Sequence, residues 1–274
     1  MITVIEGDNL KYLQSLKDGS VDLIYIDPPF NTGRKQKRMA MHNVKDEEGD
    51  RIGFKGERYK TEVTGISSYS DKFDDYQAFL EPRLQNAFRI LKLNGSLYFH
   101  IDYREVHYCK ILLDQIFGRD SFLNEIIWAY DYGARTTKKW PPKHDNILYY
   151  AKDPDHYTFN VDQIDRIPYM APGLVGKEKA ERGKLPTDTW WHTIVPTNGS
   201  EKTGYPTQKP LDILRRIVTA SSNPGDLVLD FFAGSGTTGA ACKELNRDCI
   251  LVDNNPEAIE VMKKRLTPDK ICSI

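Results

Sequence analysis

The amino-acid sequence predicts an α/β fold in which a mixed, mostly parallel sheet of seven strands carries helices on both faces and is circularly permuted. Three observations favour this fold. Short apolar runs alternate with amphipathic stretches, a glycine-rich loop lies between two strand-like segments near the C-terminus, and only 21 residues follow the end of that unit at Asp253.

The strand-like segments are short and rich in Val, Ile, Leu and aromatic residues. Several are continuous apolar runs, which is typical of parallel strands that are covered on both faces. The seven segments span residues 2–6, 21–26, 95–101, 124–130, 146–151, 226–231 and 249–252.

Helices are expected between these strands, over residues 77–92, 103–117, 210–221 and 256–266. Apolar residues recur at helical spacing in the first, although Pro82 either kinks that helix or marks its start. The last opens with Asn255, Pro256 and Glu257, which supply a cap, a proline in the first turn and an acidic side chain near the helix N-terminus. The alternation of strands and helices predicts a doubly wound sheet.

Two polar regions, residues 34–72 and 153–203, break this alternation. Between Arg34 and Lys60 there are nine Lys or Arg residues against five Asp or Glu residues, and a second basic run extends from Lys177 to Lys184. Long irregular segments in a compact domain are usually functional or mobile. We therefore expect one domain over residues 1–274, with the first region as a mobile insertion.

A cofactor loop is indicated by Gly234, Gly236 and Gly239, which follow a strand and open a helix. Asp253 stands 19 residues beyond Gly234, where a carboxylate can accept hydrogen bonds from both hydroxyls of a ribose. These features form a complete Rossmann-type fingerprint. The alternative interpretation is a tight glycine turn in an ordinary strand–helix–strand unit.

The position of this loop is unusual, because a cofactor-binding unit normally opens its domain. The other strands must come from earlier in the chain, so the strand that leads to Asp8 becomes the neighbour of the strand that ends at Asp253. Ligands of such sheets bind at the carboxyl ends of the strands. We therefore expect Asp8, Asp27, Asp230 and Asp253 around one edge of the sheet.

A rigid polar hook follows the strand at 21–26 and consists of Asp27, Pro28, Pro29 and Phe30. The two prolines fix φ and remove two backbone donors, so the loop is stiff and presents carboxylate and carbonyl acceptors. Such acceptors can hold both N–H groups of an exocyclic amine on a nucleic-acid base while Phe30 stacks on the ring. The alternative is a proline pair that only ends a strand.

With these motifs in this order, the chain resembles the amino-group DNA methyltransferases of the beta arrangement, in which a D-P-P-Y/F motif precedes the glycine motif. The resemblance covers most of the chain outside 34–72 and 153–200, and GDNLKYL, GSLYFHID, YPTQKPLDILRRIV and DFFAGSGTT also carry it. It implies a Rossmann-like S-adenosylmethionine-dependent methyltransferase fold, S-adenosylmethionine as cofactor, and methylation at N6 of a flipped-out adenine in double-stranded DNA. Asp27 favours adenine, N4 of cytosine is the alternative, and Phe30 replaces the commoner tyrosine.

The resemblance also assigns roles to residues, with Asp27, Pro28, Pro29 and Phe30 as the catalytic hook. The cofactor-binding residues are expected to be Asp8, Thr207, Gln208, Lys209, Asp230, Phe232, Gly234, Ser235, Gly236, Thr237, Thr238 and Asp253. The substrate-binding residues are expected to be Asn31, Lys138, Lys139, His144, Trp190 and Trp191. The region 34–72 would then face DNA, and 153–203 would recognise the target sequence. For the two tryptophans a core anchor is the alternative, and for His144 a surface or hydrogen-bonded histidine.

Charge, hydropathy and cysteine content indicate which classes of protein and which kinds of site can be excluded. The net charge is −1, so any nucleic-acid contact depends on local basic patches. The sequence has neither a run of about 18 apolar residues nor the pattern of a signal peptide, and we expect no membrane association. Its four cysteines form no C-x-x-C pair, which indicates reduced thiols of a cytoplasmic protein. No cluster has metal-ligand spacing, so no metal is expected.

The expected chemistry is direct methyl transfer to the amine, because no cysteine follows a proline as methylation at carbon 5 would require. An NAD-dependent oxidoreductase is the alternative from another class, since it fits the glycine loop, but it explains neither the hook nor the permuted order. A methyltransferase for protein glutamine or RNA is disfavoured by Asp27 and by the same order. A homodimer and a cognate restriction endonuclease are further partners that the resemblance leaves open.

Overall fold

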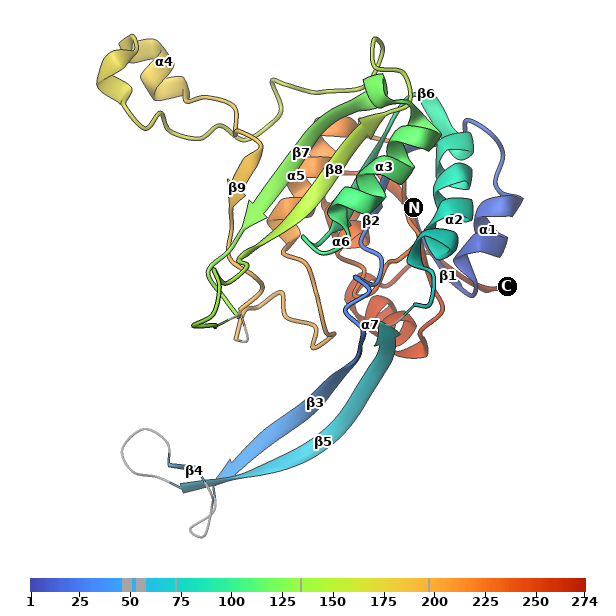
Figure 1. Cartoon of the computed structure of the whole chain (residues 1–274), viewed down its shortest axis with the longest axis vertical. Coiled ribbons are helices and arrows are strands. Elements are labelled where there is room, and N and C mark those ends of the chain that lie inside the picture. The colour runs from blue at the N-terminus through green and yellow to red at the C-terminus, as the bar shows by residue number, and fades with distance from the viewer. Residues whose placement is uncertain (46–50, 53–57, 72, 134, 197) are drawn as a thin grey trace. The chain divides into compact units, whose positions relative to one another are not determined.

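The computed structural model describes residues 1–45, 51–52, 58–71, 73–133, 135–196 and 198–274 (Figure 1). The chain divides into two compact units. The first contains Met1–Phe30 and Asp75–Ile274, and the second contains Asn31–Asp74. The expected insertion at 34–72 therefore lies within the second unit.

The described residues of the first unit form one nine-stranded sheet in the order β12-β1-β11-β10-β2-β6-β8-β7-β9. All seven predicted strands are present, and β9 and β12 are additional strands at the two edges. The strands are β1 Ile2–Glu6, β2 Val21–Ile26, β6 Leu91–Ile101, β7 Phe122–Ala129, β8 His144–Ala151, β9 Thr189–Trp191, β10 Leu227–Asp230, β11 Asp248–Asp253 and β12 Lys270–Ser273.

The sheet is mixed but mostly parallel, as predicted. Strands β12, β1, β11, β10, β2 and β6 pair in parallel, and β8 runs antiparallel to both β6 and β7. The N-terminal strand β1 lies directly beside β11, with Glu6 opposite Asp253. This pairing confirms the circular permutation, because the start of the chain completes a sheet whose cofactor-type unit is encoded last.

Helices cover the sheet in two groups (Figure 1). Helix α2 packs against both α1 and α3, while α6 packs against both α5 and α7. All six residues of β2 are buried, which requires cover on both faces of the sheet. The helices are α1 Asn9–Ser15, α2 Tyr76–Ile90, α3 Val106–Phe117, α4 Lys177–Arg182, α5 Leu211–Ser221, α6 Thr237–Glu244 and α7 Pro256–Leu266, with short 3-10 turns at Arg119–Ser121 and Pro172–Leu174.

The four predicted helices correspond to α2, α3, α5 and α7. Helix α2 begins at Tyr76 because the Asp75 side chain caps it, accepting a hydrogen bond of 2.9 Å from the backbone N–H of Ala78. Pro82 therefore lies inside the helix and does not mark its start.

The second unit contains regular structure where an irregular segment was expected. Strands β3 Arg34–Lys45, β4 Arg51–Ile52 and β5 Arg58–Asp71 form an antiparallel sheet in the order β3-β5-β4. Composition concealed these strands, because the ladder is made by backbone groups and does not require apolar side chains.

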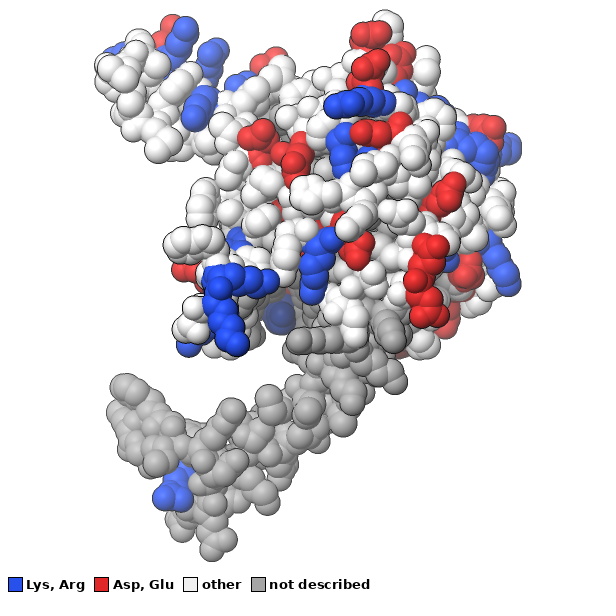
Figure 2. All heavy atoms as spheres, viewed as in Figure 1, with Lys and Arg blue, Asp and Glu red and all other residues white. Residues whose placement is uncertain are grey.

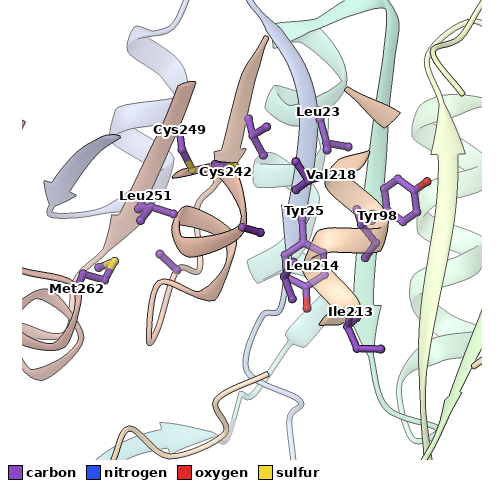
Figure 3. Packing of buried hydrophobic residues seen from close by; sticks show 14 of the residues in the cluster. Leu23, Tyr25, Tyr98, Ile213, Leu214, Val218, Cys242, Cys249, Leu251 and Met262 are labelled. Carbon is purple, nitrogen blue, oxygen red and sulfur yellow. The ribbon is translucent and has the colours of Figure 1, made fainter. Parts of the chain in front are cut away.

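A large buried cluster joins the sheet to α5, α6 and α7 (Figure 3). Leu23 and Tyr25 of β2 point toward Leu214 and Val218 of α5. Met262 of α7 belongs to the same buried cluster. The cysteines are free thiols, of which Cys109, Cys242 and Cys249 are buried. In the part of the chain that the structure describes, no helix is long and apolar enough to cross a membrane.

Candidate active site

Four parallel strands bring their carboxyl ends to one edge of the sheet. The register places Glu6 of β1 opposite Asp253 of β11, and Asp230 at the end of β10 opposite Leu251. Strand β2 pairs with β10 on the other side, so Asp27 follows at the same edge. The four carboxylates that were expected around this edge therefore all follow or end neighbouring strands.

The Asp27 carboxylate is held in an asymmetric environment. Its Oδ2 atom forms an ion pair with the Nζ atom of Lys209, and the two side chains are only 17% and 10% exposed. Its Oδ1 atom is buried and has no hydrogen-bond partner among the described residues. An unsatisfied buried acceptor costs about 1–3 kcal/mol, so this oxygen is suited to accept a donor from a ligand.

The rest of the hook is fixed by its neighbours. The Tyr76 hydroxyl donates to the Pro29 carbonyl over 2.5 Å, which ties the loop to α2. The Lys209 ammonium lies 5.0 Å from the centre of the Phe30 ring, and that ring is tilted against His100 at 5.9 Å. Phe30 thus contacts both a cation and an imidazole.

A buried polar chain behind Phe30 was not predicted from the sequence. The Tyr25 hydroxyl and His100 Nδ1 are 2.8 Å apart, His100 Nε2 lies 3.2 Å from Asp145, and the Tyr130 hydroxyl donates to Asp145 over 3.0 Å. Burial alone would raise the pKa of Asp145, but His100, together with Lys209 and Tyr130, holds it below its ordinary value. The sequence feature that could have indicated this network is the histidine in the otherwise apolar strand GSLYFHI.

The glycine loop is shaped by packing as well as by access to a ligand. Gly234 has φ +47° and donates its N–H to Asp253 over 2.8 Å. A Cβ atom at Gly236, where φ is +71°, would lie 2.8 Å from the side chain of Met262. One at Gly239 would lie 2.6 Å from Leu251. Two of the three glycines therefore allow the loop and α6 to approach α7 and β11 closely.

The carboxylates of the loop are engaged with the protein. Asp230 is buried and accepts hydrogen bonds from the Thr238 hydroxyl at 2.6 Å and from the Phe232 N–H at 3.1 Å. Burial, together with the negative charges of Asp27 and Asp253, raises the pKa of Asp230 to about 7 against the opposing effect of these two hydrogen bonds. Burial also raises the pKa of Asp253, against hydrogen bonds from backbone N–H groups including that of Gly234.

Asp8 lies at the same edge as the N-cap of α1, where its carboxylate accepts from the N–H of Lys11 over 3.1 Å. Phe232 packs its ring 6.1 Å from Phe79. Ser235 and Thr237 lie within 3.1 Å of each other through their hydroxyls.

Lys209 connects the two motifs that lie far apart in the sequence. Its side chain pairs with Asp27, and its carbonyl accepts from the Thr237 hydroxyl over 3.2 Å, directly after the glycine loop. The side chain of the preceding Gln208 holds the segment that leads to Lys209. Its oxygen accepts from the Thr203 N–H at 2.9 Å, and its amide nitrogen donates to the Glu201 carbonyl at 2.7 Å. Thr207 adopts φ +60° in the same turn. The hook and the glycine loop therefore meet at one residue.

The residues expected to bind substrate are distributed differently. Lys138 and Lys139 are exposed in the loop between β7 and β8, and His144 is the first residue of β8. Trp190 packs in the core with its indole N–H donating to the Thr187 carbonyl over 2.8 Å, which agrees with the core-anchor interpretation. Trp191 is 77% exposed.

Asn31 begins the second unit, and its side chain accepts from the N–H of Phe73 over 3.2 Å.

A cavity of about 360 Å³ lies elsewhere, with walls from Tyr98, Tyr149, Trp190 and Arg216. Neither the hook nor the glycine loop lines it. The candidate site is therefore defined by its polar geometry at the sheet edge.

Comparison with known proteins gives a consistent family. Residues 21–264 match the model of the DNA methylase family. The chain is 34% identical to the Type II methyltransferase M.HpaI of Haemophilus parainfluenzae, over 96% of this chain and 73% of that protein. It is 32% identical to the DNA adenine methyltransferase YhdJ of Escherichia coli, over 96% and 82%. The crystal structure of the M1.HpyAVI–SAM complex has a similar fold, with a TM-score of 0.61, 24% identity, and coverage of 97% and 99%.

Proposed function

Because this chain belongs to the DNA methylase family, we propose that it transfers a methyl group from S-adenosylmethionine to the N6 amine of an adenine flipped out of duplex DNA. The observation that carries the proposal is the unpartnered Oδ1 atom of Asp27, which lies beside Phe30 at the edge that also holds the glycine loop. The relatives named as Type II and adenine methyltransferases support the choice of DNA and of adenine.

The hook provides acceptors for both N–H groups of the target amine. Asp27 accepts one of them. The Pro29 carbonyl already accepts from Tyr76, so we assign the second N–H to the carbonyl of Pro28. These two bonds leave the nitrogen lone pair directed away from the acceptors and available for attack. Orientation of this kind contributes on the order of 7–11 kcal/mol to lowering a barrier.

Phe30 provides a face on which the flipped base stacks. Stacking of a base on an aromatic ring contributes about 1–3 kcal/mol, which offsets part of the few kcal/mol that unpairing costs. His100 packs against the Phe30 ring and is held by Tyr25 and Asp145, so the orientation of the ring is set before the base arrives.

The residues at the edge fit a nucleoside that carries a charged amino-acid tail. Asp8 and Asp253 are carboxylates suited to the adenine and ribose groups of such a ligand, and Gly234 and Gly236 adopt the backbone that a close approach requires. When bound, S-adenosylmethionine supplies an electrophilic methyl group on a sulfonium. The ion pair of Lys209 uses Oδ2 of Asp27, so Oδ1 can accept the target amine while the pair stays in place.

An amine of cytosine presents the same two N–H donors, so N4-cytosine methylation is the nearest competing activity. The oxidoreductase alternative is set aside by the family match. A cognate restriction endonuclease is part of the proposal, supported by relatives named as Type II enzymes. A homodimer is proposed only on the resemblance, and sedimentation analysis tests it.

Sequencing with modified-base detection tests the reaction. The chain is expressed in cells that lack DNA methylation, beside an Asp27→Ala variant as control. We expect N6-methyladenine at one short sequence with the wild-type chain and none with the variant. N4-methylcytosine, or unmodified DNA from a folded wild-type protein, would contradict the proposal.

A further inference from the structure

The loop between β7 and β8, residues 131–143, is anchored to the candidate site. The N–H of Tyr130 donates to the Lys143 carbonyl over 2.9 Å and closes the base of the loop. The Tyr130 hydroxyl bonds Asp145, Asp145 bonds His100, and His100 contacts the Phe30 ring. The base of the loop is therefore connected to the stacking residue through buried groups.

Trp140 is the most exposed tryptophan of the described residues, with 94% of its surface accessible. Single exposed apolar side chains are common on proteins and need no special cause. Trp140 differs from an ordinary exposed side chain because Pro141 and Pro142 follow it. They fix their own φ angles and restrict Trp140 to an extended conformation, so the indole is presented from a stiff backbone.

The charge of the loop suits a polyanion. Residues 131–143 contain four Lys or Arg residues and one Asp, a balance of +3 in a chain whose net charge is −1. Lys143 pairs with Asp131 at 3.5 Å, while Arg135, Lys138 and Lys139 are exposed. Figure 2 shows basic side chains gathered at the tip of β7 and β8. Such a surface attracts a phosphate backbone independently of its sequence.

We infer that Trp140 is a wedge that enters the DNA stack and occupies the space left by the flipped target base. The inference rests on the proposed function, since it requires a base to leave the duplex. The basic residues of the loop bind the DNA phosphate backbone, and Trp140 replaces the stacking that the flipped base no longer provides inside the double helix. Phe30, which is connected to the loop through His100, Asp145 and Tyr130, stacks on the extruded base. Apolar side chains inserted between base steps act in this way in other DNA-binding proteins.

The test uses Trp140→Ala, Trp140→Phe and two controls. Trp191→Ala removes the other strongly exposed tryptophan, and Lys138→Ala removes a backbone contact from the same loop. Each protein is assayed on a duplex that carries the recognition sequence found by sequencing. A second duplex has an abasic site opposite the target base, so the target is already unpaired. A third carries 2-aminopurine at the target position and reports flipping by fluorescence.

On the paired duplex we expect Trp140→Ala to lower kcat/KM by about 5- to 150-fold, the range that loss of one aromatic stacking interaction corresponds to. The fluorescence rise on binding should fall in parallel, and Trp140→Phe should retain most of both. On the abasic duplex Trp140→Ala should recover to within about threefold of wild type, because little unpairing remains to be offset. Lys138→Ala and Trp191→Ala should show the same relative defect on both duplexes.

An equal defect of Trp140→Ala on the paired and abasic duplexes would overturn the wedge, as would full activity and flipping on the paired duplex. Methylation by the wild-type chain on the paired duplex reports on the proposed function by itself. Failure of that function is therefore distinguishable from failure of the wedge.

Discussion

The ion pair between Asp27 and Lys209 joins an early and a late part of the chain, and its strength can be measured. Replacement by Lys209→Met removes the cation while keeping most of the side-chain volume. Asp27→Asn removes the anion. The double variant completes a thermodynamic cycle that isolates the interaction between them.

The structure sets the expected magnitude. Two unit charges about 4 Å apart attract by about 4 kcal/mol at the effective dielectric constant of a protein surface, and desolvation of both groups offsets part of that. The side chains are 10% and 17% exposed, so screening by water is limited. Lys209→Met also leaves both Asp27 oxygens without a cation, since Oδ1 has no partner among the described residues. We expect each single variant to lose about 2–4 kcal/mol of unfolding free energy, with a coupling of about 1–3 kcal/mol.

Urea unfolding followed by circular dichroism measures all four proteins. A control is Lys263→Met, which breaks an exposed pair with Glu260 at 2.7 Å and should leave the unfolding free energy close to that of the wild-type chain, because water screens the pair. If the effects of Lys209→Met and Asp27→Asn simply add in the double variant, the two residues do not interact and the reasoning is refuted.

Two further predictions concern the glycine loop. Gly236→Ala should lower the unfolding free energy by about 2–4 kcal/mol, because the backbone is left-handed there and the new Cβ atom would lie 2.8 Å from Met262. Gly225→Ala is the control, because Gly225 has φ +86° but no atom within 4 Å, and it should lose only the backbone strain of about 1–2 kcal/mol. Equal losses in the two variants would contradict the packing argument. The raised pKa of Asp230, about 7, means that the folded state binds the proton more tightly, so its contribution to stability is full below about pH 4 and is lost as pH rises through 7. Relative to Asp230→Asn, the wild-type unfolding free energy should therefore fall between pH 4 and 7, by no more than about 1.4 kcal/mol per pH unit, and a flat difference would contradict that pKa.

The strands and the permuted order were predictable because β2 is fully buried and β10 and β11 are buried at most of their apolar positions, so all three read as continuous apolar runs. The edge strands were not predicted. Strand β9 has three residues, and the residues of β12 are mostly exposed and polar at its ends, so neither has a periodic signal.

The candidate site was only partly predictable. The acidic residues at strand ends and the glycine loop follow from local pattern, and the structure brings them to one edge as expected. The pairing of Asp27 with Lys209 joins residues 182 positions apart, and no local rule specifies such a contact. The same holds for the buried link from His100 to Asp145, since the two residues are 45 positions apart on the paired strands β6 and β8.

Trp190 and Trp191 show why adjacent residues can differ in role. Side chains alternate across a strand, so in β9 one indole packs in the core and the other faces solvent. Because the sequence did not indicate a strand at this position, it could not distinguish between them.

The central claim is that the Asp27 carboxylate receives the target amine at an edge that also binds the cofactor. The most direct test is a paired measurement on Asp27→Ala, with methyl transfer to DNA by a radiolabel assay and S-adenosylmethionine binding by calorimetry. Methyl transfer should fall by at least about 10³-fold, while the dissociation constant of the cofactor stays close to that of the wild-type chain. Turnover at the wild-type rate in this variant would contradict the claim.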